Sequence, residues 1–133
     1  MLIWPTPKPA VKAAIAILVD AFGNYAFVSA KLPGKTPRPE RFVKVSRVGG
    51  NHPHPATDNA RLLVECFAKD TAQCEAMCNT ARAALHNAAG TIVADDVFIR
   101  SWGNETGPQD FPHPDILEYD RWQLQGDLLV KSN

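Results

Sequence analysis

Two histidines close together raise the question of metal chemistry. His52 and His54 lie in the stretch GGNHPHPATD, and Asp58 follows shortly after them. A catalytic zinc site takes three protein ligands in tetrahedral geometry. The remaining histidines, His86 and His113, lie far along the chain, and no carboxylate joins them at a recognisable spacing. This incomplete ligand set favours an exposed polar loop, and a small metal-dependent enzyme remains the alternative.

The other reactive side chains show no catalytic arrangement. Cys74 and Cys78 lie one turn apart on an apolar helical stripe, which favours core packing. With Cys66 they make an odd number, so we expect three reduced thiols and no disulfide framework. Adjacent Asp95 and Asp96 would point to opposite faces of a strand and so would not form a general acid–base pair. No phosphate-binding glycine loop and no Gly-x-Ser-x-Gly motif is present. Enzyme activity would therefore need an arrangement of catalytic residues that sequence spacing does not reveal.

The overall composition is that of a soluble globular domain. The chain has 133 residues, which predicts a single domain over residues 1–133. Fourteen basic residues balance 14 acidic ones, whereas a dedicated nucleic-acid binder usually carries a basic excess. The apolar stretch near the start is short and is interrupted by Asp20, which argues against a signal peptide. No segment is long enough to span a membrane, so we expect no membrane partner, and the reduced thiols indicate a cytoplasmic protein.

The first half of the chain predicts one helix and three strands. A helix is expected from about Lys8, with one apolar stripe, and Gly23-Asn24 should end it. The stripe consists of Val11, Ile15, Leu18, Val19 and Phe22. Residues 25–32, 41–48 and 61–68 alternate or run apolar in the manner of strands.

The second half predicts one more helix and two more strands. Asp70 and Gln73 form a capping-box pattern ahead of an apolar stripe that Gly90 closes. Strands are expected over residues 92–102, with a bulge or turn at Asp95-Asp96, and over 119–131. The fold class is therefore α+β: an antiparallel or mixed sheet of about five strands with two helices packed on one face.

Three irregular segments could contact other molecules. They are a proline-rich N-terminal arm at 1–10, a hairpin tip at 49–59 and a long loop at 103–115. Trp4 and Phe111 lie in such segments, where an exposed aromatic ring suggests a protein contact and a buried one suggests core packing. A mild basic cluster runs through residues 31–47, and it fits either a solvated sheet edge or a patch that meets a partner.

Several of these phrases together resemble a known family. They are RFVKVSRVGG followed by TDNARLLVECFAKD, the helix EAMCNTARAALHNAAG, the loop GPQDFPHPD and the closing YDRWQLQGDLLVKS. The arrangement, over about residues 11–131, is similar to tail terminator proteins of long-tailed, siphovirus-type bacteriophages, especially those of actinobacteria.

The resemblance implies a structural virion protein of the tail or neck, assembled in the host cytoplasm, with no catalytic residues, no cofactor and no enzyme activity. Such proteins form a hexameric ring that caps the head-proximal end of the tail tube and stops its polymerisation. The implied partners are further copies of the chain, the major tail tube protein and a head-completion or connector protein, with genomic DNA passing through the lumen without specific binding.

Hairpin loops of the family contact the tube, which implies that role for residues 49–58. The interface candidates are Arg41, Arg47, Asn51, His52, His54, Asp58, Trp4, Phe111 and His113. Two further alternatives stay open: another neck component, such as a head–tail connector, and a dimeric module that binds a small ligand.

Overall fold

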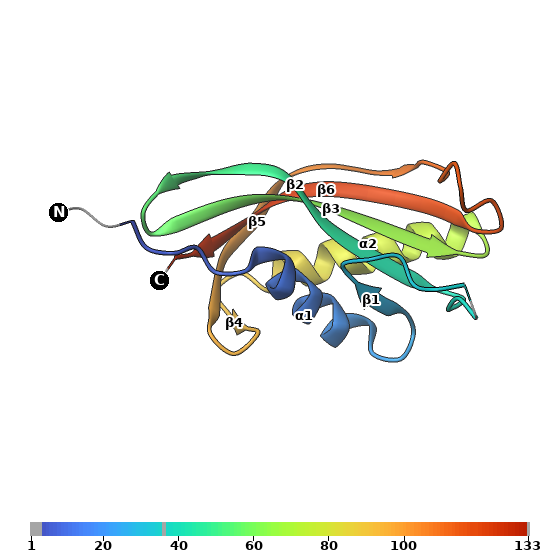
Figure 1. The fold of residues 1–133 in the computed structure, drawn as a ribbon, viewed down its shortest axis with the longest axis horizontal. Helices are drawn as coiled ribbons and strands as arrows, with labels where there is room; N and C mark the ends of the chain where they lie inside the picture. The colour runs from blue at the N-terminus through green and yellow to red at the C-terminus, as the bar shows by residue number, and fades with distance from the viewer. Residues whose placement is uncertain (1–3, 36, 133) are drawn as a thin grey trace.

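The chain folds into two helices and six strands, and the structure, a computed structural model, describes residues 4–35 and 37–132. The elements in order are α1 (Ala10–Phe22), β1 (Phe27–Ser29), β2 (Phe42–His54), β3 (Thr57–Ala68), α2 (Thr71–Asn87), β4 (Ile92–Val93), β5 (Val97–Asp110) and β6 (Asp120–Lys131). Figure 1 shows both helices on one face of a long, twisted sheet. This confirms the predicted α+β class, with six strands instead of about five.

The six strands form one mixed sheet in the order β1-β2-β3-β6-β5-β4. β1 is parallel to β2, and every other neighbouring pair is antiparallel. The central pair β3–β6 is regular over its full length, from Thr57 beside Lys131 to Ala68 beside Asp120. The two halves of the chain therefore meet in the middle of the sheet.

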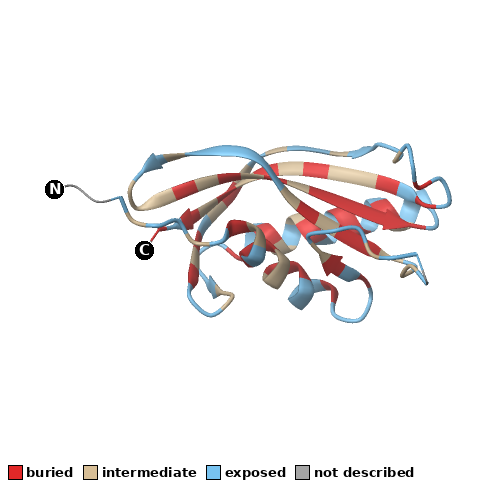
Figure 2. Cartoon of the chain, viewed as in Figure 1, coloured by how far each residue is buried: buried red, intermediate tan, exposed pale blue. Residues whose placement is uncertain are grey.

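Strand alternation divides the molecule into a helix-covered face and an open face. Leu62, Val64 and Cys66 of β3 are buried against the helices, as their spacing predicts. Arg61 and Leu63 point to the other face, which no helix covers (Figure 2). The main core lies between the sheet and the helices, and a second small cluster lies on the open face.

The helix ends follow the predicted signals. The Asp70 side chain accepts a hydrogen bond from the Gln73 backbone at 2.8 Å, and the Gln73 amide donates to Asp70 Oδ2 at 2.8 Å. α1 ends before Gly23, whose N–H donates to the carbonyl of Val19. The predicted α1 stripe was wrong at Val19, which is exposed, because the buried face is centred on small residues that let α1 approach closely. The buried α1 residues are Ala10, Ala13, Ala14, Ile17, Leu18 and Phe22.

Two segments predicted as loops are paired strands. β2 and β3 remain paired out to His54 and Thr57, which leaves Pro55 and Ala56 as the turn, so most of the expected tip at 49–59 is strand. A bulge after Arg47 accommodates the glycines. Gly50 has φ +110°, and an added Cβ would overlap the Asn59 carbonyl oxygen, so only glycine fits there.

β5 likewise continues to Asp110, which corrects the expected long loop at 103–115. Its register with β6 shifts after Gly103 and after Thr106. Asn104 and Gly107 have positive φ values, so the strand bends without leaving its partner. The true connection to β6 is residues 111–119. None of the helices in the described ranges is long and apolar enough to cross a membrane.

Candidate functional site

The two histidines of the hairpin end stabilise local structure. A ring nitrogen of His52 lies 3.3 Å from the Pro55 carbonyl oxygen and 3.2 Å from the Ser132 hydroxyl. His54 Nδ1 accepts a hydrogen bond from the backbone N–H of Ala56 at 3.1 Å. Within residues 4–35 and 37–132, no three His, Cys, Asp or Glu side chains are grouped so as to hold a metal ion. The hairpin end is therefore a polar structural element with His54 exposed at its tip.

The described part of the N-terminal arm, from Trp4 onward, lies against this hairpin end. Trp4 is about half exposed, and its ring meets the His52 ring edge-on at a centroid distance of 4.9 Å. Lys8 Nζ forms an ion pair with Asp96 at 2.7 Å, which ties the arm to the β4–β5 turn. A hollow of about 550 Å³ remains between the arm and the sheet, and Asn51 and His52 line part of it. Figure 1 shows the arm, the hairpin end and the end of β6 gathered at one end of the molecule.

Arg47 and Asp58 form an ion pair on the helix-covered face. The guanidinium donates to both carboxylate oxygens, at 2.9 and 3.1 Å, and this contact raises the pKa of Arg47. Asp58 is only 2% exposed, so it is a buried partner of Arg47 instead of the surface contact expected for it. Arg41 precedes β2, where it donates to the Tyr25 carbonyl oxygen and lies over the Tyr25 ring. Both arginines therefore make contacts within the chain, Arg41 with Tyr25 and Arg47 with Asp58.

Phe111 and His113 lie in the β5–β6 connection on the open face. Phe111 is half exposed, with the guanidinium of Arg121 5.2 Å from its ring centre. His113 is partly buried beside Phe67, and its Nδ1 accepts from the backbone N–H of Asp115. The connection also covers the second cluster. That cluster consists of Phe42, Phe67, Ile116 and Tyr119, with the two phenylalanine rings stacked at 4.4 Å.

A buried charge cluster supports the same connection. Arg121 Nη1 donates to Glu65 at 2.6 Å, and Lys44 lies 3.6 Å from the other oxygen of that carboxylate. Arg121 Nε also donates to the Phe111 carbonyl oxygen at 2.6 Å. Each buried charge is paired, which is the condition under which burial is tolerated.

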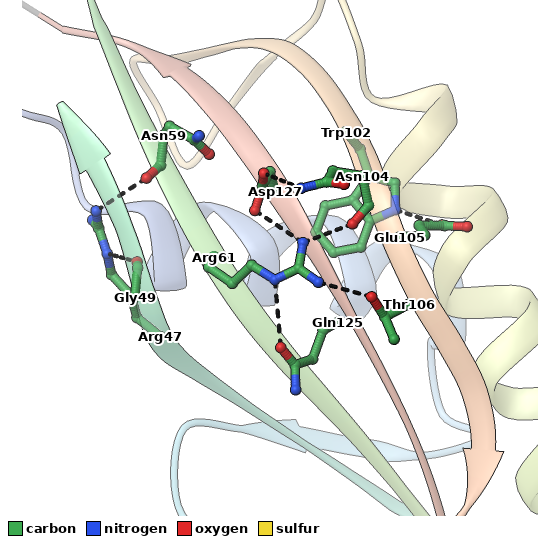
Figure 3. A network of polar contacts seen from close by, with 10 residues as sticks. All are labelled: Arg47, Gly49, Asn59, Arg61, Trp102, Asn104, Glu105, Thr106, Gln125 and Asp127. Carbon is green, nitrogen blue, oxygen red and sulfur yellow. Dashed lines mark hydrogen bonds and ion pairs between the residues drawn. The ribbon is translucent and has the colours of Figure 1, made fainter. Parts of the chain in front are cut away.

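Arg61 forms the centre of a second polar network, shown in Figure 3. Its guanidinium donates to the Asn104 carbonyl oxygen at 2.6 Å, to Thr106 at 3.0 Å and to Asp127 at 3.1 Å. A longer bond, 3.4 Å, reaches Gln125. One side chain of β3 thus connects β6 with the bent part of β5. Sequence inspection missed this network, although Arg61 and Asp127 lie on the same face of two predicted strands.

Trp102 and Glu105 form a second contact that sequence inspection missed. The indole N–H donates to Glu105 at 2.6 Å, and Arg82 and His86 of α2 approach the same carboxylate at 2.8 and 3.1 Å. Burial tends to raise the pKa of Glu105, but the bonds from Trp102 and Arg82 outweigh it and hold the pKa below its ordinary value. This carboxylate joins β5 to α2.

The three cysteines are free and buried in the main core, as predicted. Interaction with the neighbouring Cys78 thiol, together with burial, raises the pKa of Cys66. Burial raises the pKa of Cys74 to about 12, and its Sγ lies 3.2 Å from the Asp120 carbonyl oxygen. Neutral, buried thiols are poor nucleophiles.

The residues singled out from the sequence are thus placed in three groups. Trp4, Asn51, His52 and His54 gather at the hairpin end, Arg47 and Asp58 pair beside it, and Arg41, Phe111 and His113 lie elsewhere. No group combines a nucleophile, a base and an enclosed cavity. The surfaces that remain for function are the exposed hairpin end, the open sheet face and the lateral edges of the sheet.

Comparisons with known proteins agree with a structural role. A profile of the family described as phage tail termination protein matches residues 8–131. A solved structure described as the virion of a native gene transfer agent particle matches with a TM-score of 0.56 and 13% identity, covering 88% of this chain and 86% of that one. That likeness concerns the fold alone. No curated protein sequence matches the chain.

The α+β fold presents an exposed hairpin end, an open sheet face and lateral sheet edges as surfaces for contact, and the family match defines the class of protein. Because the family profile spans nearly the whole chain, the protein belongs to the phage tail termination protein family. It is therefore a structural component of a bacteriophage tail.

Proposed function

We propose that this protein is a tail terminator that closes the head-proximal end of the tail tube as a hexameric ring. In that position it stops addition of tube subunits and presents a surface for the head-completion protein. The observation that carries the proposal is the family match over residues 8–131. The resemblance noted from the sequence extends the proposal to siphovirus-type phages of actinobacteria.

Two structural features support a passive role for the lumen. The formal net charge is zero, and the charges of the open sheet face are largely paired within the chain, as in Lys44–Glu65–Arg121 and Arg61–Asp127. A strongly basic channel would hold DNA through many phosphate contacts. A surface with paired charges would let the genome pass without specific binding.

The test is tail assembly without this protein. Phage lacking a functional copy of this chain should produce tails of irregular, excessive length that do not join heads, as seen by negative-stain electron microscopy. Supplying the wild-type chain in trans should restore uniform tails. Uniform tails without the protein would contradict the proposal. Uniform tails that fail only to join heads would favour a head–tail connector role.

We also propose that the hairpin end contacts the tail tube. Asn51 and His54 are exposed there, whereas His52 and Asp58 are held inside the chain, so the first two are the candidate contacts. Replacing both with glutamate should reduce capping of purified tubes while the fold is retained. Glu75→Lys is the control, because it changes the charge of an exposed residue on α2, away from the hairpin end. Normal capping by the Asn51→Glu/His54→Glu variant would exclude this contact.

A further inference from the structure

We infer that neighbouring copies join head to tail through the two lateral edges of the sheet, with β5 of one copy beside β2 of the next. The inference rests on the proposed ring and specifies its subunit interface. The partner is thus a second copy of this chain, and the contact is a continuation of the sheet.

Both lateral edges carry strand backbone without a neighbour. β1 pairs with β2 only at Phe42–Lys44, so the outer edge of β2 from Val45 to His54 has no strand beside it in the described residues. β4 covers only Val97 and Phe98 of β5, so its outer edge from Arg100 to Asp110 is likewise open. Figure 2 shows long exposed stretches along both strands. Unpaired edges present N–H and C=O groups that can accept another strand.

The directions of the two edge strands suit a head-to-tail contact. β2, β3, β6 and β5 alternate in direction, so β2 and β5 run in opposite senses. A rotation about a ring axis parallel to the strands preserves these senses, so β5 of one copy would meet the next β2 as an antiparallel neighbour. The helix-covered faces of the two copies would then lie on the same side.

The register places matching parts of the two edges at one level. Gly49 is paired with Arg61, Arg61 with Asp127, and Asp127 with Gly103. The open part of β2 around Val48 is therefore level with the first half of the open edge of β5. Copies arranged in a flat ring would bring these two stretches together without a large shift along the strands.

Opposite charges distinguish the two edges. Residues 31–47 contain six basic side chains and one acidic one, whereas residues 92–110 contain four acidic side chains and one basic one. Most of these charges have ion-pair partners within the chain, but Lys31 and Lys35 near β1 and Asp110 at the end of β5 have none among the described residues. Pairing across the sheet, through Trp122, Cys66 and Val43 to Val28, places Asp110 level with β1. Arg100 is the single basic side chain in residues 92–110. The opposite charges of the two different edges attract each other, whereas two copies of the same edge repel. This favours head-to-tail over head-to-head contact.

Exposed apolar side chains add contact area on both sides. Phe27 and Val48 are each 50% exposed along the β1–β2 edge, and Ile92 is 65% exposed beside β5. Pro53 and Pro108, which lack a backbone N–H, limit how far a new strand could pair on either edge. The edges are therefore suited to a short, specific contact.

A pair of engineered thiols tests the geometry. The chain would carry Val48→Cys and Ser101→Cys, which lie on opposite edges, and the native thiols are buried and would not compete. Variant protein would be assembled on tails by complementation, treated with a short bifunctional maleimide and separated by denaturing electrophoresis. The double variant should give a ladder that ends at the closed ring. Each single variant is the matched control and should stay monomeric.

The outcomes separate the interface from the function. Crosslinked dimers from either single variant would show a like-edge contact and overturn the inference. Tails of normal length and capped ends, but no ladder from the double variant, would also overturn it while leaving the terminator function intact. Overlong tails that carry wild-type protein but no ring would instead contradict the proposed function.

A charge exchange covers the case in which the cysteine variant fails to assemble. Lys31→Glu/Lys35→Glu should lower the yield of capped tails at least several-fold, and Asp110→Lys should also lower it. Combining the three changes places opposite charges on the two edges again and should recover most of the yield. Absence of loss in both variants, or loss without recovery in the combined variant, would overturn the inference.

Discussion

At the scale of single residues, Gly126 is a position where side-chain volume decides stability. The Trp102 ring lies directly over Gly126, and an added Cβ would come 2.7 Å from Cε2 of the indole and closer still to two other ring atoms. Gly126→Ala must displace an indole that is buried and hydrogen-bonded to Glu105. We expect a loss of about 1–3 kcal/mol in the free energy of unfolding, measured with urea.

Gly103→Ala is the matched control for this substitution. Gly103 lies beside Asp127 in the neighbouring strand, has nothing within 4 Å of a built Cβ and has no left-handed φ. Its effect should stay within about 0.5 kcal/mol. Equal effects of the two substitutions would show that the indole is free to move.

Glu105 should make stability depend on acid pH. Its pKa is lower in the folded state, because the bonds from Trp102 and Arg82 outweigh burial. A depressed pKa contributes stability that is complete above the unfolded value, about pH 4.3 for glutamate, and is lost as pH falls through the lower folded value. Glu105→Gln should therefore be less stable than wild type at pH 7, and the difference should narrow below about pH 4.3. Urea titrations at several pH values measure this difference in unfolding free energy. A difference that does not change with pH would refute the lowered pKa of Glu105.

At the scale of elements, the Arg61 network should hold β3, β6 and the bent part of β5 in register. Arg61→Met keeps much of the side-chain length but leaves Asp127 without its cation. We expect a loss of about 1–3 kcal/mol in unfolding free energy, since a partly buried charged partner loses its hydrogen bonds. Amide exchange over Gly103–Gly107 should also become faster.

Arg100→Met provides the control for the loss of positive charge. Arg100 is exposed and makes a single bond of 3.4 Å to the Ala56 carbonyl oxygen. Its replacement should change stability by no more than about 0.5 kcal/mol. A comparable loss in both variants would mean that net charge, and not the network, is responsible.

The elements show what the sequence could and could not predict. The capping pair Asp70–Gln73 and the apolar faces of β3 and β6 depend on spacing along one segment, and the structure confirms them. The ends of β2 and β5 were missed because Gly, Asn and Pro usually mark loops, whereas here a partner strand keeps these residues paired. The Arg61 and Glu105 contacts depend on strand order, which spacing does not encode. The buried position of Asp58 was missed for the same reason.

At the scale of the whole molecule, the N-terminal arm should stabilise the hairpin end. Removing residues 1–6 eliminates the Trp4–His52 contact but keeps Lys8 and its ion pair with Asp96. The domain should still fold, because the main core, as far as the described residues show, begins at Ala10. Hydrogen–deuterium exchange should then accelerate at 51–57 and stay unchanged in α2. Unchanged exchange at 51–57 would show that the arm contact is not stabilising.

The cluster of Phe42, Phe67, Ile116 and Tyr119 is separated from the main core by the full thickness of the sheet. The β5–β6 connection can therefore open at the expense of this cluster and of the hydrogen bonds that Arg121 and Tyr119 donate to Phe111 and Pro39, while the layer beneath the helices stays closed. In the proposed terminator, local adaptation of this connection to a partner would therefore not require the rest of the subunit to loosen.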